Sequence, residues 1–552
     1  MLLITSGEYV ETELHAEFGK IPPAFLPVGN KRLYTYQVDQ FSKFYEKIYL
    51  TIPDDFELDR ADERYFDAHD ISVFRTEAGA PLGAAVHDFL VATGAEGRVD
   101  ILYGDTLIGD ALDTTELPGT PDTSDTPDPA GHRSTDWLAV GDSDENYHWH
   151  QEKPRNGQPG GAWTGMFSFG DARLLCTTLG HMADFIGAVG RYGELVGQMQ
   201  HRVVRKWLDF GHIHTYFDSK REITTQRHFN QLRIADGVLT KSSTDTWKML
   251  AEADWFERAP AVVKPFLPNF IARKETQPAG YLLEYLHLAA LNELYVFGRL
   301  PPRVWKKIFA ACDTFLQAAS QVPLPSPLAQ DFSELTYSRK TLNRLTQFSE
   351  QSGISLDMPW RFNDRQTPSL RAMAQEAADA VLSSPGASAF IHGDFCFSNI
   401  LFDFRAGRVK IVDPRGVDAQ GKVTPFGDLR YEVGKLAHSV IGLYDFLISG
   451  FFALEIDGDM VTFEIFGGRS DVVKSIFLDT TFIGRKPVAW DCYPVMLLLF
   501  LSMLPLHLDN PLRQKAFMAN CLKLYLEWTD DHHTNGRTEQ SLHPSGLYPA
   551  EI

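Results

Sequence analysis

Residues 390–416 read FIHGDFCFSNILFDFRAGRVKIVDPRG. This stretch places Asp394 and Asn399 five positions apart. Residues 400–412 then form two apolar runs separated by a glycine-containing turn, a pattern that predicts a β-hairpin. A hairpin of this length would bring Asp413 back beside Asn399.

These three polar residues suit a site for phosphoryl transfer. That reaction needs a carboxylate to take the proton of the acceptor hydroxyl, and oxygen ligands to hold Mg²⁺ on the phosphates. Asn399 and Asp413 would offer two such ligands, and Asp394 has the spacing from Asn399 that kinase catalytic loops show. The alternative is that the three residues only punctuate two turns, which favour Asp and Asn. Their order and spacing favour the phosphoryl-transfer interpretation.

The run HGDFCFSNIL followed by IVDPRG resembles the aminoglycoside phosphotransferase and choline kinase family, whose members are relatives of the protein kinases. The resemblance implies an α+β protein-kinase-like domain that uses ATP as phosphoryl donor and a small-molecule alcohol as acceptor. It also implies that Asp394 is the catalytic base and that Asn399 and Asp413 bind Mg²⁺.

Upstream of this stretch, residues 229–240 predict a hairpin with an Asp-Gly turn, and residues 246–258 predict a helix. A kinase-like site needs a strand lysine on the ATP phosphates, fixed by a glutamate from the next helix. Lys241 and Glu252 match these positions, although Lys248 competes with Lys241 and both charges could instead be solvated at the surface. The helix can present four apolar residues on one face: Trp247, Leu250, Ala251 and Trp255.

Three further features resemble the same family. GYLLEYL at 280–286 is similar to the hinge strand, where backbone groups at Glu284 and Leu286 would meet the adenine. Asp428 matches a structural carboxylate that supports the catalytic loop. Arg415 is compatible with a phosphate contact, an acidic partner or an ordinary surface position. Apolar residues at helical spacing predict helices over 302–320, 338–351 and 369–382.

The first 225 residues alternate short apolar strands with amphipathic segments. This alternation indicates βαβ units and an α/β, Rossmann-like sheet with helices on both faces. The expected strands are 2–5, 47–52, 71–74 and 99–103.

Within this part, KIPPAFLPVGNKRL at 20–33, PLGAAV at 81–86 and the strand that ends at Asp105 resemble the sugar-phosphate nucleotidyltransferases. The later runs AWTGMFSF and KWLDFGH resemble that family's substrate-side strand and its second aspartate. The resemblance implies Asp105 and Asp209 as Mg²⁺ ligands, with Gly83 near the base of a second nucleoside triphosphate.

The phosphate-binding loop departs from that family. Its loop is glycine-rich and basic, because backbone N–H groups and positive charge hold the triphosphate. Here Gly7 is followed by EYVETELHAE, which contains four glutamates. Pro23 occupies the position of a family lysine, for which Lys20 or Lys31 could substitute. Nucleotidyl transfer and a degenerate binding role therefore both stay open.

Composition narrows the class of protein. A chain of 552 residues predicts several domains, here 1–225, 226–530 and a poorly ordered tail at 531–552. The net charge of -20 argues against a nucleic-acid partner. Five scattered cysteines without a C-x-x-C pair indicate neither a zinc site nor disulfides, which fits a reducing cytoplasm. The N-terminus lacks a secretory signal, and the most apolar run, 495–508, is too short to span a bilayer and predicts a buried helix.

Two local patterns have no catalytic interpretation. Residues 114–133 are rich in Pro, Asp and Thr, which predicts a mobile surface insertion. The HWH run at 148–150 could suggest a metal, but alternating strand residues point to opposite faces and no third ligand is evident. A partly buried strand is the better interpretation.

Together these patterns predict a bifunctional enzyme. A kinase would phosphorylate a sugar, polyol or amino alcohol, and a nucleotidyltransferase would activate the phosphomonoester for surface-polysaccharide assembly. One alternative is a kinase whose N-terminal domain only binds or assembles. A second is a non-catalytic scaffold of a glycan pathway, against which the set of Asp394, Asn399 and Asp413 speaks.

Overall fold

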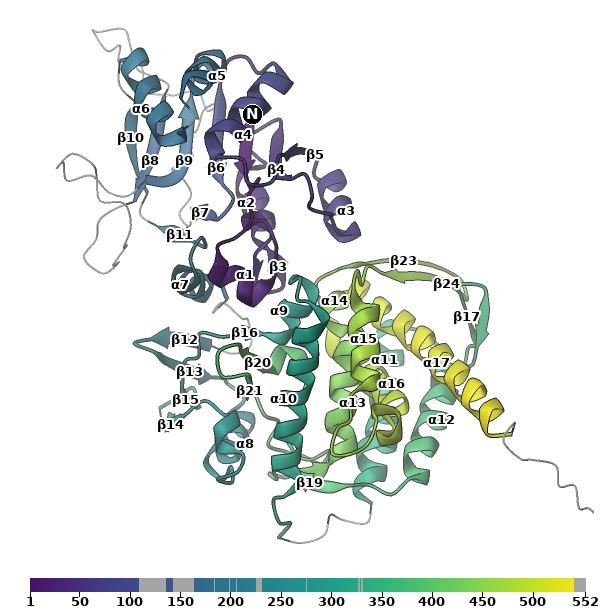
Figure 1. Cartoon of the computed structure of the whole chain (residues 1–552). Coiled ribbons are helices and arrows are strands. Elements are labelled where there is room, and N and C mark those ends of the chain that lie inside the picture. Colours follow the sequence, from purple (N-terminus) through teal and green to yellow (C-terminus); the bar gives the residue numbers. More distant parts are fainter. Residues whose placement is uncertain are drawn as a thin grey trace, which may run out of the picture. The chain divides into compact units, whose positions relative to one another are not determined.

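The computed structural model describes residues 1–108, 136–141, 163–224 without 183, 198 and 205, and 231–540 without 275, 326, 327, 329 and 330. The chain forms two compact units (Figure 1): unit 1 is 1–227 with 293–301, and unit 2 is 228–292 with 302–552. The predicted boundary after 225 lies two residues before this division. The runs 114–133 and 148–150 lie outside the described residues.

Unit 1 is built on a seven-stranded sheet in the order β10-β8-β9-β6-β1-β4-β5. Strands β5, β4, β1 and β6 are mutually parallel, whereas β9 is antiparallel to both β6 and β8. The four strands expected from the sequence are all present, and the α/β prediction is confirmed. The strands are β1 (Leu2–Thr5), β4 (Ile48–Pro53), β5 (Ile71–Thr76), β6 (Val99–Tyr103), β8 (Trp137–Gly141), β9 (Trp163–Phe169) and β10 (Gln200–Val204).

The central strand β1 is buried on both faces, as parallel strands usually are. Leu3 belongs to a core formed with helices α4 (Leu82–Thr93), α5 (Ala172–His181) and α6 (Phe185–Val196). Its neighbours Leu2 and Ile4 are also fully buried. Unit 1 further contains α1 (Thr12–Phe18), α2 (Leu33–Phe41), α3 (Arg60–Ala68), α7 (Ile213–Thr224), the pair β2 (Pro27–Val28) and β3 (Lys31–Arg32), and the pair β7 (Thr106–Ile108) and β11 (Trp207–Asp209).

A short segment from much later in the chain, 293–301, completes unit 1, which the sequence did not indicate. The backbone N–H of Arg299 donates to the carbonyl of Phe18 at 2.7 Å. The guanidinium of Arg32 donates to the carbonyl of Phe297 at 3.2 Å. The segment begins inside helix α9 (Leu291–Val296), so unit 1 is discontinuous in sequence.

The N-terminal part of unit 2 is an antiparallel sheet in the order β12-β13-β15-β14, with helix α8 (Thr246–Glu257). The hairpin predicted around an Asp-Gly turn is present, and Asp236 and Gly237 both have positive φ, as a type I′ turn requires. The strands are β12 (Gln231–Ala235), β13 (Val238–Ser242), β14 (Phe270–Lys274) and β15 (Gly280–Glu284).

Two of the four residues predicted to form the apolar face of α8 are exposed. Trp247 and Leu250 are 56% and 41% exposed, whereas Ala251 and Trp255 are buried. The helix buries Met249 and Phe256 instead, because its inner face also has to carry Glu252, which a hydrophobic pattern cannot reveal.

The rest of unit 2 is mainly helical. Helix α16 is buried along almost its whole length and packs against α11, α12, α13 and α17. The buried helix expected over 495–508 is therefore confirmed as far as Met503, whereas Leu506 and Leu508 are exposed. Among the described residues, no helix combines the length and apolar character needed to cross a membrane. The helices are α10 (Pro302–Ser320), α11 (Lys340–Ser352), α12 (Leu370–Ser383), α13 (Leu429–Val440), α14 (Tyr444–Ile448), α15 (Ser470–Asp479), α16 (Cys492–Met503) and α17 (Pro511–Gln540).

Unit 2 also contains short strands before and between these helices in the sequence. They are β16 (Ala289–Ala290), β17 (Trp360–Phe362), β18 (Arg365–Thr367), β19 (Ser388–Phe390), β20 (Ile400–Asp403), β21 (Arg408–Ile411), β22 (Phe426–Asp428), β23 (Phe452–Asp457) and β24 (Met460–Ile465).

The start predicted for a poorly ordered tail, residue 531, is wrong, because it lies inside a helix. Helix α17 continues to Gln540, and Asp530 accepts two hydrogen bonds of 2.8 Å from Arg365. Each residue added to an existing helix gains a backbone hydrogen bond at little further cost, so a polar composition did not mark the end. Residues 541–552 lie outside the described part of the chain.

Candidate active site

The predicted hairpin after Asn399 is confirmed. Strands β20 and β21 are antiparallel, with Ile400 opposite Ile411. The backbone N–H of Val412 donates to the carbonyl of Asn399 at 3.0 Å. Asp413 is the next residue, so the hairpin returns it to the end of the ladder where Asn399 lies.

Asp394 and Asn399 are joined directly. The side-chain amide of Asn399 donates to the backbone carbonyl of Asp394 at 2.9 Å and to its carboxylate Oδ2 at 3.1 Å. A 3₁₀ turn at Phe397–Asn399 lies between the two residues in sequence and makes this approach possible.

Lys435 contacts the same carboxylate and was missed by the sequence interpretation. Its Nζ lies 2.7 Å from Oδ1 of Asp394, and its side chain is 13% exposed. Burial favours the protonated form of Asp394, but Lys435 and Arg415 outweigh it and hold the pKa of this carboxyl well below its usual range. Asp394 is therefore ionised at neutral pH. No local motif marks Lys435, which lies on α13.

Replacing Lys435 tests this pairing. In Lys435→Gln we expect the pKa of Asp394 to rise, so that the acidic limb of the kcat–pH profile moves to higher pH. We expect kcat to fall about 10- to 100-fold, the usual worth of a hydrogen bond to a charged group. The control is Lys474→Gln, which removes a lysine paired at 2.8 Å with Glu527. An unchanged acidic limb in Lys435→Gln would contradict this assignment.

Buried groups hold the HGD turn in place. The carboxylate of Glu432 accepts from the backbone N–H groups of His392 and Gly393, both at 2.9 Å. Burial lowers the pKa of His392 to about 4, so the ring is neutral. Its Nε2 donates to the carbonyl of Val412 at 2.9 Å, and its Nδ1 accepts from the N–H of Asp394. The histidine of the motif thus ties the catalytic loop to the end of the hairpin.

Lys241 lies between two carboxylates. Its Nζ is 2.7 Å from Glu252 and 3.0 Å from Asp413, and its side chain is 3% exposed. Tyr281 donates to Glu252 at 2.7 Å. The competing lysine, Lys248, is 54% exposed and 3.9 Å from Glu252. The structure therefore places Lys241, and not Lys248, beside Asp413.

The predicted hinge lies at the end of β15. Glu284 donates its backbone N–H to the carbonyl of Asn269 at 2.9 Å, and its carboxylate accepts from the Asn269 amide at 2.8 Å. Leu286 follows the strand and is half-buried. The carboxylate of Glu284 is thus occupied by Asn269, and the adenine contacts at Glu284 and Leu286 stay a prediction.

In unit 1 the two predicted carboxylates converge. A Cβ on Gly211 would lie 2.7 Å from Oδ2 of Asp105 and 3.2 Å from Oδ1 of Asp209, so both groups face the same small space. Burial, and then the charge of Asp209, raise the pKa of Asp105 to about 7. Two adjacent carboxylates repel one another when both are ionised, and a divalent cation bound between them removes this repulsion.

A variant of unit 1 tests this carboxylate pair. Because folding raises the pKa of Asp105, the protonated carboxyl stabilises the folded state, and this stabilisation is lost as the pH rises from about 4 to about 7. At pH 8 Asp105 is ionised, and its repulsion with Asp209 is complete. We therefore expect Asp105→Asn to raise the melting temperature at pH 8 in EDTA and to abolish the stabilisation that Mg²⁺ gives the wild type. The exposed Asp67→Asn in α3 is the control. A lower melting temperature for Asp105→Asn in EDTA would contradict the repulsion.

The predicted phosphate-binding residues of unit 1 are engaged elsewhere. Lys20 pairs with Asp55 at 2.7 Å, and Lys31 pairs with Asp39 at 3.2 Å. A Cβ on Gly7 would overlap the hydroxyl of Thr76, so the backbone there is closely packed. Gly83 lies buried in the first turn of α4. The segment between β1 and α1, residues 6–11, contains a single glycine, Gly7.

Each candidate metal site contributes only two side chains. Across the described ranges, no group of three or more His, Cys, Asp or Glu residues could hold a metal ion. Mg²⁺ sites of nucleotide enzymes commonly use one or two protein ligands with phosphate oxygens and water. Asn399 with Asp413, and Asp105 with Asp209, fit that pattern.

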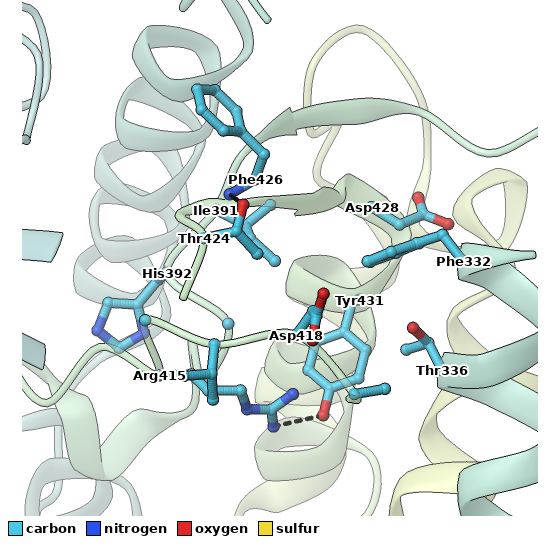
Figure 2. Close-up of a pocket in the computed structure, with 14 residues that line it drawn as sticks. Phe332, Thr336, Ile391, His392, Arg415, Asp418, Thr424, Phe426, Asp428 and Tyr431 are labelled. Carbon is cyan, nitrogen blue, oxygen red and sulfur yellow. Dashed lines mark hydrogen bonds between the residues drawn. The ribbon is translucent and has the colours of Figure 1, made fainter. Parts of the chain in front are cut away.

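A pocket adjoins the HGD turn (Figure 2). Gly393, Arg415 and Tyr431 line it, together with Thr336 from the helical turn before α11. Arg415 donates to the hydroxyl of Tyr431 at 2.6 Å. Of the three interpretations left open for Arg415, an ordinary surface position is therefore wrong.

Comparison with known proteins is consistent with this geometry. The family model of the phosphotransferase enzyme family (APH) matches residues 232–414. No curated protein matches the chain significantly.

Three solved structures are similar in part. A nucleoside-diphosphate-sugar pyrophosphorylase from Vibrio cholerae is 15% identical over 40% of this chain and 100% of its own, with a TM-score of 0.28. HddC from Yersinia pseudotuberculosis is 12% identical over 40% of this chain and 99% of its own, with a TM-score of 0.28. An aminoglycoside-3'-phosphotransferase of type VIII is 12% identical over 56% of this chain and 98% of its own, with a TM-score of 0.27.

The matched range 232–414 contains Lys241, Glu252 and the whole stretch from Asp394 to Asp413. The chain therefore carries an ATP-dependent phosphotransferase domain that is similar to the phosphotransferase enzyme family over residues 232–414.

Proposed function

We propose that unit 2 transfers the γ-phosphoryl group of ATP to a hydroxyl group of a sugar, polyol or amino alcohol, with Asp394 as the base. One observation carries the proposal. The Lys241–Glu252 pair reaches Asp413 at 3.0 Å, while Asn399 holds Asp394 at the same end of the β20–β21 hairpin. Residues far apart in sequence thus meet in the arrangement that phosphoryl transfer needs.

In the reaction, the acceptor oxygen forms a bond to the γ-phosphorus as the bond to the bridging oxygen of ADP breaks. The hydroxyl proton passes to Asp394, which is ionised because Lys435 and Arg415 stabilise its charge, and then to water. Lys241 holds the ATP phosphates. Glu252 fixes the ammonium group of Lys241 at 2.7 Å.

The oxygens of Asn399 and Asp413 fit Mg²⁺, which prefers hard oxygen ligands and leaves positions for phosphate oxygens. The backbone bond between Val412 and Asn399 keeps the two ligand residues adjacent. When bound, Mg²⁺ neutralises the negative charge of the phosphates. Asn399 and Asp413 would hold it, and Lys241 would position the phosphates against it.

For unit 1 we propose nucleotidyl transfer to the phosphomonoester product, which would yield an activated precursor for surface polysaccharide. The convergence of Asp105 and Asp209 supports it. A second candidate is a degenerate unit that binds or assembles without catalysis. The ion pairs of Lys20 and Lys31 favour this candidate, because they engage the two lysines that were expected to bind a triphosphate.

One experiment separates these candidates. We would record ³¹P NMR spectra of the full chain with Mg²⁺, ATP, CTP, GTP and UTP and a pooled library of sugars, polyols and amino alcohols. A new phosphomonoester followed by a diphosphate diester and pyrophosphate would support both activities. A phosphomonoester that accumulates without pyrophosphate would support the degenerate unit 1. The absence of any phosphomonoester would contradict the kinase proposal.

A further inference from the structure

Several cations gather around Tyr431, one of the residues that line the pocket in Figure 2. The guanidinium of Arg415 lies 4.8 Å from the ring centroid of Tyr431, and the ammonium of Lys340 lies 5.8 Å from it. Lys435 adds a third cation one turn further along α13. Tyr431 itself is 4% exposed, so these charges surround a buried group.

Lys435 is paired with Asp394 at 2.7 Å, and the charges of Asp394 and Glu432 also stabilise Arg415. Within the described part of the chain, neither Arg415 nor Lys340 forms an ion pair with Asp or Glu at 4.0 Å or less, and both contact Tyr431. Two carboxylates line the pocket, but both are engaged. Asp418 accepts from backbone N–H groups of its own turn, and Asp428 pairs with Arg430 at 2.7 Å.

The titration of Lys340 and Tyr431 reflects the surrounding cations. Tyr431 stabilises the charge of Lys340, yet burial and the cations Arg415 and Arg344 lower the pKa of Lys340 to about 8. Burial raises the pKa of Tyr431, but Arg415 and Lys340 outweigh it and lower that pKa to about 7. A lysine that loses its proton more easily and a tyrosine that does the same both indicate excess positive potential.

One further polar side chain, Thr336, lines the same pocket. The hydroxyl of Thr336 is buried and forms no hydrogen bond with any described residue. Figure 2 shows Thr336 on the helix that faces Arg415 and Tyr431. Buried polar groups are nearly always hydrogen-bonded, so a ligand with acceptor oxygens suits this position as well as the cations.

From this arrangement we infer that the acceptor carries an anionic group, a phosphate or a carboxylate, which Arg415 and the Thr336 hydroxyl bind in this pocket and which the charge of Lys340, beside Tyr431, stabilises. The inference rests on the proposed kinase function of unit 2. Gly393 lines the pocket and is followed directly by Asp394, so an anion held there places a neighbouring hydroxyl beside the base. The substrate class is therefore a phosphorylated or acidic sugar or polyol.

The test is binding to the full chain with its nucleotide site filled by Mg²⁺ and AMPPNP. Isothermal titration would compare matched probes: glycerol 3-phosphate with glycerol, glucose 6-phosphate with glucose, and glucuronate with glucose. We expect at least one anionic probe to bind at least tenfold more tightly than its neutral partner. Binding of no anionic probe, or equal binding of both members of each pair, would overturn the inference.

Two variants locate the anion. Arg415→Gln and Lys340→Gln should each weaken binding of the anionic probe about 10-fold or more, the worth of one charge-assisted hydrogen bond. Lys340 is partly exposed, so Lys340→Gln remains informative if Arg415→Gln fails to fold. Arg408→Gln and Lys306→Gln, at exposed positions, are the matched controls. Unchanged anion affinity in Lys340→Gln, or a rise in the Kd for ATP alone, would overturn the inference.

Turnover separates this inference from the kinase proposal. Phosphorylation of neutral acceptors without preference for anionic ones would overturn the inference and leave the kinase in place. Anion binding that depends on Arg415 and Lys340, without phosphoryl transfer to any probe, would support the anion site and contradict the kinase.

Discussion

Asp394→Asn should reduce kcat by roughly 10²- to 10⁴-fold, the usual contribution of a positioned base. An amide of the same shape cannot take the proton of the acceptor hydroxyl. The hydrogen bond from Asn399 to the backbone carbonyl of Asp394 would remain, so the loop should keep its shape. The rate would be measured by ³¹P NMR with the acceptor found in the pooled screen, and the Kd for ATP should change little.

The variant also leaves the ammonium of Lys435 without its carboxylate, so a modest loss of thermal stability is expected. Asp379→Asn changes an exposed carboxylate on α12 and serves as the control for any general effect of the substitution. If Asp394→Asn kept most of the wild-type kcat, the assignment of the base would be wrong.

Asp413→Asn should raise the Mg²⁺ concentration needed for half-maximal activity by about 10²-fold, since losing even an outer-shell partner of a metal ligand costs 10- to 100-fold. The backbone of Asp413 has a φ of 57°, a left-handed conformation that Asn tolerates well. The substitution therefore removes charge and leaves the turn intact. Lys241 keeps Glu252 as its partner. Activity would be titrated against Mg²⁺, with partial recovery expected at high concentration.

Asp413→Ala separates the role of the charge from that of the backbone. Alanine in the left-handed region costs about 1 kcal/mol, so this variant should be less stable than Asp413→Asn by that amount while showing the same Mg²⁺ defect. Urea unfolding would measure the difference in free energy of unfolding. Normal Mg²⁺ dependence in Asp413→Asn would remove this residue from the metal site.

The sequence predicted those parts of the site that are local in the chain. The interval from Asp394 to Asp413 forms one turn and one hairpin, and its spacing and turn residues identified both. The Asp236-Gly237 turn was predicted for the same reason. Lys241 and Glu252 were chosen by resemblance, and their 2.7 Å contact agrees with that choice.

Contacts across long sequence separations could not be predicted in this way. Lys435 reaches Asp394 from α13, and Glu432 on the same helix binds the HGD turn. Both residues appear in the sequence as ordinary charges on an amphipathic helix, and only the packing of α13 directs them inward. Trp247, which was predicted on the apolar face of α8, is exposed. Periodicity shows which residues can share a face of a helix, but it does not show which face is buried.

The segment 293–301 has a practical consequence for how the protein can be divided. Because it belongs to unit 1 while the residues on both sides belong to unit 2, the polypeptide passes between the units three times. No single cut separates them. A fragment ending at 227 would lack Arg299, which donates to Phe18, and Phe297, which accepts from Arg32. A fragment starting at 228 would carry the segment 293–301 without these contacts. Gene truncation would thus test incomplete units, whereas point variants in the intact chain leave both units whole.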